Sequence, residues 1–194
     1  MSREEPAAPP LHLVLLGAPG SGKGTQAVRL AADTGARHIS TGDLLRAEVA
    51  AGSRLGQRVA GYLDAGELVP DEVLLELTLP LVEQAAGEQG YLLDGFPRSV
   101  DQARQLAEGA GDGVGVNRVV FLAVPRDELV RRLLRRAAEQ GRSDDTAEVI
   151  HRRLQVFDEE TRPLLDHYRA AGLLTAVDGN ADPDEVARRI RSAL

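Results

Sequence analysis

Short apolar runs alternate with longer amphipathic segments along most of this chain. The runs that we expect to form strands are residues 11–16, 90–94, 118–124 and 173–177, with a weaker strand at 37–40. The segments between them carry apolar residues at helical spacing. This alternation is typical of an α/β fold, and it predicts a five-stranded parallel sheet flanked by helices that cross over with a right-handed sense.

The helices expected between these strands cover residues 22–33, 43–51, 53–64, 71–86, 100–108, 127–139, 144 or 145 to 171, and 184–193. Asp71 is the predicted N-cap of its helix, in which Pro80 is expected to produce a kink. Asp144 or Asp145 is the predicted cap of the long helix, with a bend expected at Pro163. The first ten residues contain three prolines and two glutamates and predict a disordered tail. Residues 11–194 are therefore expected to form a single domain.

A glycine-rich loop directly follows the first apolar run. It reads GAPGSGKGT from Gly17 to Thr25 and has the spacing G-x-x-x-x-G-K. Glycines let successive backbone N–H groups approach an anion, and Lys23 adds a positive charge at the phosphate edge, so the loop predicts a polyphosphate site. Gly24 follows the lysine where Ser or Thr is usual, and the hydroxyl stands one position later, at Thr25. We therefore expect Mg²⁺ to be held mostly through water and nucleotide oxygens.

Composition limits the class of partner. The formal net charge is -7 and aromatic residues make up 3% of the chain, which argues against nonspecific nucleic-acid binding and against stacking platforms for single strands. The chain has no cysteine, so a disulfide framework and a thiolate zinc site are excluded. No apolar run has the ~20 residues of a membrane helix, and no secretion signal opens the chain. We expect a cytoplasmic protein with no membrane partner.

Two polar clusters fall where strands are expected to end. The first, ISTGDLLR, presents Thr41 and Arg46, and Arg46 is suited to clamp a phosphate. The second, LDGFPRSVDQ, places Asp94 beyond a strand, where ligands gather in open parallel sheets. There Asp94 could order water on Mg²⁺, while Arg98 reaches a second phosphate and Gln102 reads a base. The local alternatives are a helix cap in the first cluster, and turn hydrogen bonds with an exposed arginine in the second.

Arginines surround a predicted helix break at Gly141. Arg136 and Arg142 flank this break, which can swing cations onto transferring phosphates, and Arg153 lies in the next helix. Such charge runs are usually solvated helix faces, which is the interpretation that we adopt for Arg131, Arg132, Arg135 and Arg152. A last segment, GELVPD at residues 66–71, is a turn whose backbone could meet an adenine edge, although by itself it is only a loop before a helix.

Together these segments resemble the adenylate kinase family of nucleoside monophosphate kinases, and among them the members with a short lid. The resemblance rests on GAPGSGKGTQA at Gly17, ISTGDLLR at Ile39, GELVPDE at Gly66, LDGFPRSVDQA at Leu93 and GRSDD at Gly141. It extends from Leu13 to Ile190. It implies a P-loop nucleotide-binding fold with an AMP-binding segment at 40–69, a lid at 136–142 and a core at 11–39, 70–135 and 143–194.

The resemblance also implies the site residues. ATP would be bound by Gly20, Ser21, Gly22, Lys23, Gly24, Thr25, Arg136 and the backbone near Ala181. AMP would be bound by Thr41, Arg46, the backbone of Glu67, Leu68 and Val69, and by Gly95, Phe96, Pro97, Arg98, Gln102, Arg142 and Arg153. The catalytic charges would be Lys23, Arg98, Arg136, Arg142 and Arg153. Mg²⁺ would be bound by Asp94 through water, with Thr25 as a second candidate ligand, and no zinc is expected.

An AMP phosphate is already anionic at neutral pH, so transfer needs cations and positioning rather than a general base. The expected reaction is reversible, Mg²⁺-dependent transfer of the ATP γ-phosphoryl group to AMP, giving two ADP, by a monomer. A UMP/CMP kinase is less favoured, because such relatives have alanine at the position of Thr41 and asparagine at that of Gln102. A GTP:AMP phosphotransferase, a nucleotide-binding regulator without transfer and a simple P-loop hydrolase remain as alternatives.

Overall fold

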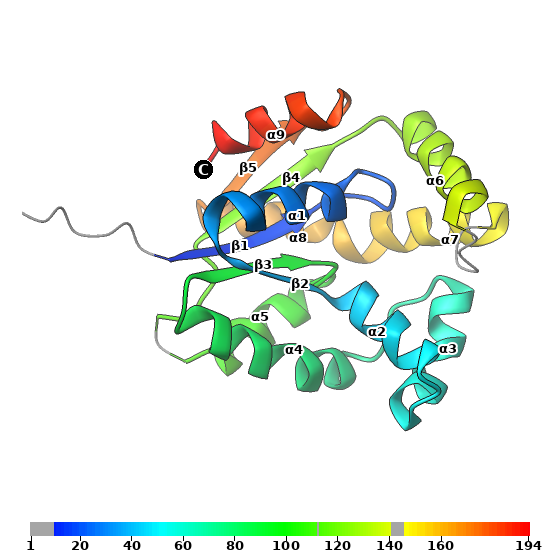
Figure 1. Cartoon of the computed structure of the whole chain (residues 1–194), viewed down its shortest axis with the longest axis horizontal. Helices are drawn as coiled ribbons and strands as arrows, with labels where there is room; N and C mark the ends of the chain where they lie inside the picture. The colour runs from blue at the N-terminus through cyan, green and yellow to red at the C-terminus, as the bar shows by residue number, and fades with distance from the viewer. Residues whose placement is uncertain (1–9, 112, 141–145) are drawn as a thin grey trace, which may run out of the picture.

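The structure, a computed structural model, describes residues 10–111, 113–140 and 146–194 (Figure 1). Its centre is a sheet of five strands in the order β2-β3-β1-β4-β5. The strands are β1 (Leu11–Leu16), β2 (Arg37–Ser40), β3 (Gly90–Asp94), β4 (Arg118–Ala123) and β5 (Leu174–Asp178). Every pairing between neighbours is parallel, so the predicted sheet is confirmed, including its weaker strand at 37–40.

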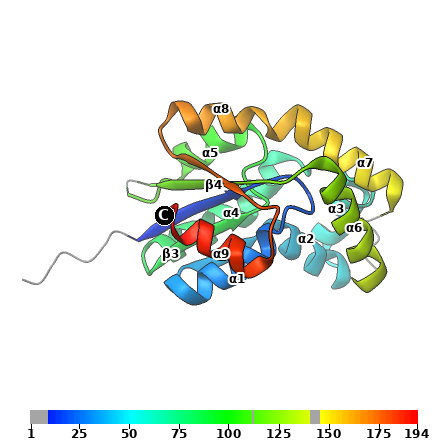
Figure 2. The ribbon, with the colours of Figure 1, turned by 90° about the horizontal axis from the view of Figure 1, so that it is seen from above.

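Helices connect the strands and cover both faces of the sheet (Figures 1 and 2). They are α1 (Lys23–Thr34), α2 (Thr41–Ala50), α3 (Arg54–Ala65), α4 (Asp71–Ala86), α5 (Val100–Gly109), α6 (Arg126–Gln140), α7 (Ala147–Val156), α8 (Pro163–Ala170) and α9 (Pro183–Arg191), with a π-helical turn at Phe157–Thr161 between α7 and α8. The predicted helical segments are confirmed over the described residues, except that the long segment expected up to residue 171 is divided into α7 and α8. Pro80 lies inside α4 without ending it.

The helix starts differ from the predictions. Ser40 caps α2 by accepting the Asp43 backbone N–H, so this helix begins at Thr41. Asp71 is not a cap, because it is the first residue of α4 and its carboxylate accepts a hydrogen bond from Gln102 instead. Thr146 caps α7, whereas Asp144 and Asp145 lie outside the described residues.

A π-helical turn precedes Pro163, where a bend was predicted. Its hydrogen bond runs from the Arg162 N–H to the Phe157 carbonyl oxygen at 2.8 Å, five residues back, and Pro163 then opens α8. Proline has no backbone N–H to donate, so the start of a helix is the place where it is tolerated. The long segment is therefore two helices joined by one wide turn.

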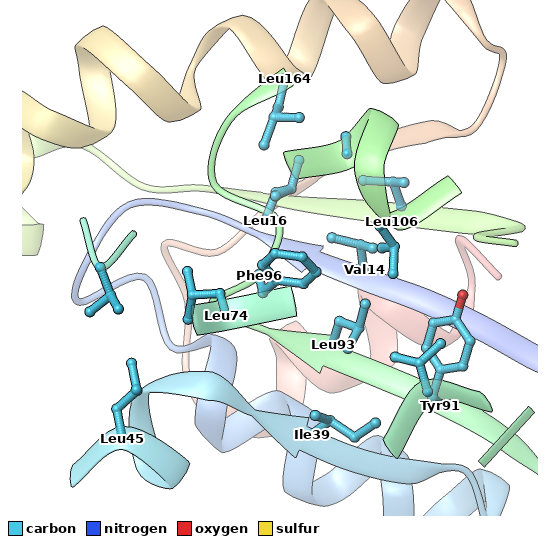
Figure 3. Packing of buried hydrophobic residues seen from close by; sticks show 14 of the residues in the cluster. Val14, Leu16, Ile39, Leu45, Leu74, Tyr91, Leu93, Phe96, Leu106 and Leu164 are labelled. Carbon is cyan, nitrogen blue, oxygen red and sulfur yellow. The ribbon is translucent and has the colours of Figure 1, made fainter. Parts of the chain in front are cut away.

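The two faces of β1 pack against different helices. Leu13 and Leu15 are buried with α1 and α9, whereas Val14 and Leu16 face the layer of α4, α5 and α8. Figure 3 shows the second layer, where Val14 and Leu16 lie among Leu93, Phe96, Leu106 and Leu164. Full burial of such side chains stabilises the fold by about 1.5–3 kcal/mol each. The strand that leads into the glycine loop is thus fixed from both sides.

Two helical units project from the same end of the sheet, beyond the carboxyl ends of the strands: α2 with α3, and α6 with α7 (Figures 1 and 2). The glycine loop and Asp94 lie at this end too, which is where ligands bind in open α/β sheets. None of the helices in the described part of the chain combines the length and the apolar character needed to cross a bilayer.

Candidate active site

The glycine loop joins β1 to α1 and is fixed by close packing. Gly20 has φ +84°, and a Cβ added there would lie 2.9 Å from the Leu129 carbonyl oxygen of α6. Both the backbone angle and the space therefore require glycine at this position. The Ser21 N–H donates to the Ala18 carbonyl oxygen at 3.1 Å, which tightens the turn. The Ser21 hydroxyl oxygen is buried and has no hydrogen-bond partner among the described residues, as suits a group that meets a ligand oxygen.

Lys23 is the first residue of α1, at the end of the helix where unpaired backbone N–H groups attract anions. Its ammonium group donates to the carbonyl oxygens of Gly17 at 2.7 Å and Ala18 at 3.1 Å. The pKa of Lys23 is lowered to about 8, chiefly by burial and also by nearby arginines, against the opposing effect of Asp94. The two carbonyl oxygens thus position the ammonium group in the loop. Burial disfavours its charged form as long as no anionic ligand is bound.

Asp94 ends β3 and stands beside this lysine. Its side chain is 13% exposed, and Oδ2 lies 3.9 Å from Nε2 of His38. Burial opposes ionisation of Asp94, but His38, Lys23 and Arg98 together lower its pKa below the usual value. A Cβ on Gly24 would lie 3.4 Å from the same carboxylate oxygen, so the loop and Asp94 share one small space.

These residues fit a magnesium ion that is held largely by other ligands. Asp94 supplies one anionic oxygen, and Thr25 is exposed on the wall of the same cleft. Over residues 10–111, 113–140 and 146–194 no group of three or more metal-ligating side chains exists. Mg²⁺ commonly keeps several waters and binds through one or two carboxylates together with phosphates, which agrees with this sparse set.

A large cleft brings together the residues expected to bind ATP. Its lining includes Gly20, Ser21, Gly22, Lys23, Gly24, Thr25, Asp94, Arg98, Arg136, Arg153 and Ala181. Arg132 and Arg135 line it as well. Arg135 is 74% exposed and pairs with Glu139 one turn further along α6, as expected for a solvated helix face. Arg132 is only 23% exposed, so that interpretation was wrong for Arg132. Arg132 is held by Glu128 at 2.6 Å and donates to the Gly179 carbonyl oxygen at 3.2 Å, across the cleft floor. That long-range contact has no signal in the sequence.

A second, smaller pocket adjoins the cleft on the side of α2 and α3. It is lined by Thr41, Arg46, Glu67, Leu68, Val69, Gly95, Arg98 and Arg153 together with Leu45, Leu63 and Leu74. Most of the residues expected to bind AMP are thus collected here. Gly42, Arg46, Gly95, Arg98 and Arg153 line both spaces, so two ligands would meet at a shared wall that carries three arginines.

The shared wall is held by short local contacts. Arg46 donates to the Asp43 carboxylate at 2.5 Å, and Arg98 donates through Nε to the Gly95 carbonyl oxygen at 2.8 Å. Gly95 has φ +87°, and a Cβ there would lie 2.8 Å from the Thr41 hydroxyl oxygen. Glycine at this position therefore lets the Arg98 turn approach the start of α2.

Three of the predicted AMP-binding residues take other places. Phe96 is 1% exposed and belongs to the core, and its peptide bond to Pro97 is cis. Pro97 lines a small neighbouring pocket together with Lys23 and Arg98. Gln102 is fully buried and lines neither the cleft nor the second pocket, although it contacts the backbone of Arg98.

Arg152, which the sequence interpretation placed on a solvated face, makes a two-point ion pair instead. Its Nε and one terminal nitrogen donate to the two carboxylate oxygens of Glu67 at 2.6 and 3.0 Å. The hydrogen bond from Arg152 is the main cause that lowers the pKa of Glu67. The pair ties the turn after α3 to α7. Arg142 lies outside the described residues, so its predicted place is not tested.

Comparison with known families and proteins gives one consistent answer. The family model described as adenylate kinase matches residues 15–173. The adenylate kinase of Stenotrophomonas maltophilia strain R551-3 is 48% identical over 186 residues, which are 95% of this chain and 99% of that protein. The adenylate kinase of Thermus thermophilus is 48% identical over 183 residues, 94% of this chain and 96% of that protein. The adenylate kinase of Clavibacter michiganensis is 46% identical over 184 residues, 94% of this chain and 92% of that protein.

Proposed function

This chain belongs to the adenylate kinase family, and from that premise we propose that it transfers the γ-phosphoryl group of ATP to AMP, reversibly and with Mg²⁺, to give two ADP. The observation that carries the proposal is the wall shared by the cleft and the second pocket, in which Arg46, Arg98 and Arg153 face both spaces. A simple hydrolase would need only the glycine loop. A second phosphate-binding set opposite that loop calls for an acceptor with its own phosphate.

The chemistry needs little from the protein beyond charge and position. The acceptor phosphate is anionic at neutral pH and attacks without a general base, while negative charge spreads over the moving phosphoryl group. Lys23, Arg98, Arg136 and Arg153 supply positive charge around the place where the two spaces meet. We assign Arg142 the same role on the basis of the resemblance. Loss of one such cation is expected to cost about 3–5 kcal/mol of transition-state stabilisation.

Each substrate has its own set of residues in this proposal. Residues 20–25 hold the ATP phosphates through backbone N–H groups and Lys23, and the backbone near Ala181 meets the donor base. Thr41, Arg46, the 67–69 backbone and the 95–98 turn hold AMP, and Gln102 reads its base. Segments 40–69 and 136–142 close over the two substrates, which excludes water as a competing acceptor.

Mg²⁺ would be oriented by Asp94 through water, with Thr25 beside it, and would neutralise charge on the donor phosphates. We propose a cytoplasmic monomer that binds nucleotides and neither nucleic acid nor zinc. A single chain supplies both walls of the meeting point, so the proposed site needs no residue from a second subunit.

The test is a phosphotransfer assay with purified protein that crosses ATP and GTP with AMP, CMP, UMP and GMP, with Mg²⁺ present or withheld. We expect ATP with AMP and Mg²⁺ to be the fastest combination and ADP to be the only product. Preference for CMP or UMP would contradict the acceptor assignment. Release of inorganic phosphate without AMP phosphorylation would contradict transfer altogether.

A further inference from the structure

We propose that Asp71 sets the purine preference of the acceptor pocket by fixing the orientation of the Gln102 amide. The inference rests on the proposed role of Gln102 as the reader of the acceptor base. Asp71 opens α4 and Gln102 lies in the first turn of α5, whose start is capped by Ser99. The contact between their side chains joins two helices across 31 residues of sequence.

Two groups of opposite character hold the Gln102 amide. Its Nε2 donates to the Asp71 carboxylate at 2.6 Å, and its Oε1 accepts from the backbone N–H of Arg98 at 2.6 Å. A carboxylate only accepts and a backbone N–H only donates. Turning the amide by 180° would set oxygen against oxygen and N–H against N–H. Because Gln102 is fully buried, water cannot relieve that mismatch.

The fixed Gln102 amide has one N–H donor and one acceptor position on its oxygen that remain for a ligand. An amide nitrogen carries two N–H groups and an amide oxygen has two acceptor positions, of which the protein uses one each. Adenine presents an acceptor at N1 next to a donor at its amino group, and this pair matches the fixed amide. Hypoxanthine and guanine present the reverse, N1–H next to the oxygen O6. An amide free to turn would accept either edge, so the fixed orientation favours adenine.

The place of the pair agrees with this role. Leu74, which lies three residues after Asp71 on α4, lines the second pocket, and so does Arg98. Gln102 contacts the Arg98 backbone from behind this wall. Only Pro70 separates Asp71 from segment 40–69. The closure that we propose for that segment would therefore bring the acceptor base to the amide while the contact with Asp71 preserves the orientation of the amide.

The decisive experiment uses AMP and IMP as acceptors with ATP as donor, since their bases differ only at the edge in question. In Asp71→Asn, the amide at position 71 can either donate or accept, so one of the two constraints on Gln102 is lost. We expect the ratio of kcat/KM for AMP to that for IMP to fall about tenfold, a change on the scale of one hydrogen bond to a charged group. Glu72→Gln is the matched control, because it removes the same charge from the exposed neighbouring residue and should leave the ratio unchanged.

A merely structural role for Asp71 would lower the activity with both acceptors alike, and an unchanged ratio in a folded Asp71→Asn protein would overturn the inference. If that variant does not fold, Asp71→Ser, whose hydroxyl donates or accepts, takes its place. The Gln102→Ala variant distinguishes base reading by Gln102 from the orienting role of Asp71. Collapse of the ratio in Gln102→Ala with an intact ratio in Asp71→Asn would overturn only the role of Asp71. An intact ratio in Gln102→Ala would overturn base reading by Gln102, and the role of Asp71 with it.

Discussion

The two regions that we propose for the two substrates are built in opposite ways. On the donor side, one short loop between β1 and α1 supplies backbone N–H groups and a single titratable cation, Lys23. On the acceptor side, α2, the turn after α3 and the turn after β3 each supply one part, and the cations are arginines. The donor region depends on local backbone shape, whereas the acceptor region depends on the fold that brings its parts together.

The largest effect is expected from a substitution that impairs only the donor side. Lys23→Met keeps the length of the side chain but removes its charge, so kcat should fall at least about a thousandfold, as for loss of a transition-state cation. The melting temperature should change little, because an ammonium group that is costly to bury is replaced by an apolar one. Steady-state turnover and thermal unfolding measure the two effects. Turnover above one tenth of wild type would show that the loop backbone alone suffices.

The next largest effect is expected from a substitution in the wall that the two regions share. Arg98→Ala should lower kcat/KM for AMP by about two to three orders of magnitude, because we propose that its guanidinium binds the acceptor phosphate. ATP binding, measured by calorimetry without AMP, should weaken far less. Equal losses for the two substrates would mean that Arg98 belongs to the donor side as much as to the acceptor side. Arg104→Ala, an exposed arginine on α5 outside the two substrate spaces, is the control.

The contrast between lysine and arginine should also appear in the pH dependence. Burial lowers the pKa of Lys23 to about 8, so the charged form in the free enzyme is lost as pH rises through 8. The kcat/KM for ATP should therefore decline about tenfold per unit above that pH. With ATP saturating, the bound phosphates keep the lysine charged, and kcat/KM for AMP should hold to higher pH. Identical basic limbs for the two substrates would contradict this distinction.

The smallest expected effect concerns the acceptor side alone. Glu67→Gln weakens the pair with Arg152 that ties the turn after α3 to α7. Because the pair is partly exposed, its contribution is small, and we expect the KM for AMP to rise no more than about fivefold. The KM for ATP should stay constant. Arg152→Lys, which keeps the charge but loses the two-point contact, should produce a similar shift if geometry matters more than charge.

The same contrast explains what could be predicted from the sequence. The five strands, the phosphate loop and the place of Asp94 follow from patterns within a few residues, and the structure has the sheet as predicted. Arg132 and Arg152 were assigned to solvent because charge runs usually are solvated, yet their surroundings depend on contacts with Gly179 and Glu67, which are remote in sequence. Asp71 was predicted to be a helix cap because it stands at the start of a segment with helical spacing, and its partner Gln102 could not be foreseen because that residue belongs to another helix.

The shared wall has a consequence for how such an enzyme can evolve. Arg98 and Arg153 line both of the spaces that we propose for the substrates. A substitution at either position would therefore alter the binding of both substrates, and selection would act on both effects together. Positions that line only one of the two spaces, such as Ala181 in the cleft, carry no such double constraint. A lineage that acquires a new donor or a new acceptor should therefore change the outer ends of the two spaces first and their common wall last.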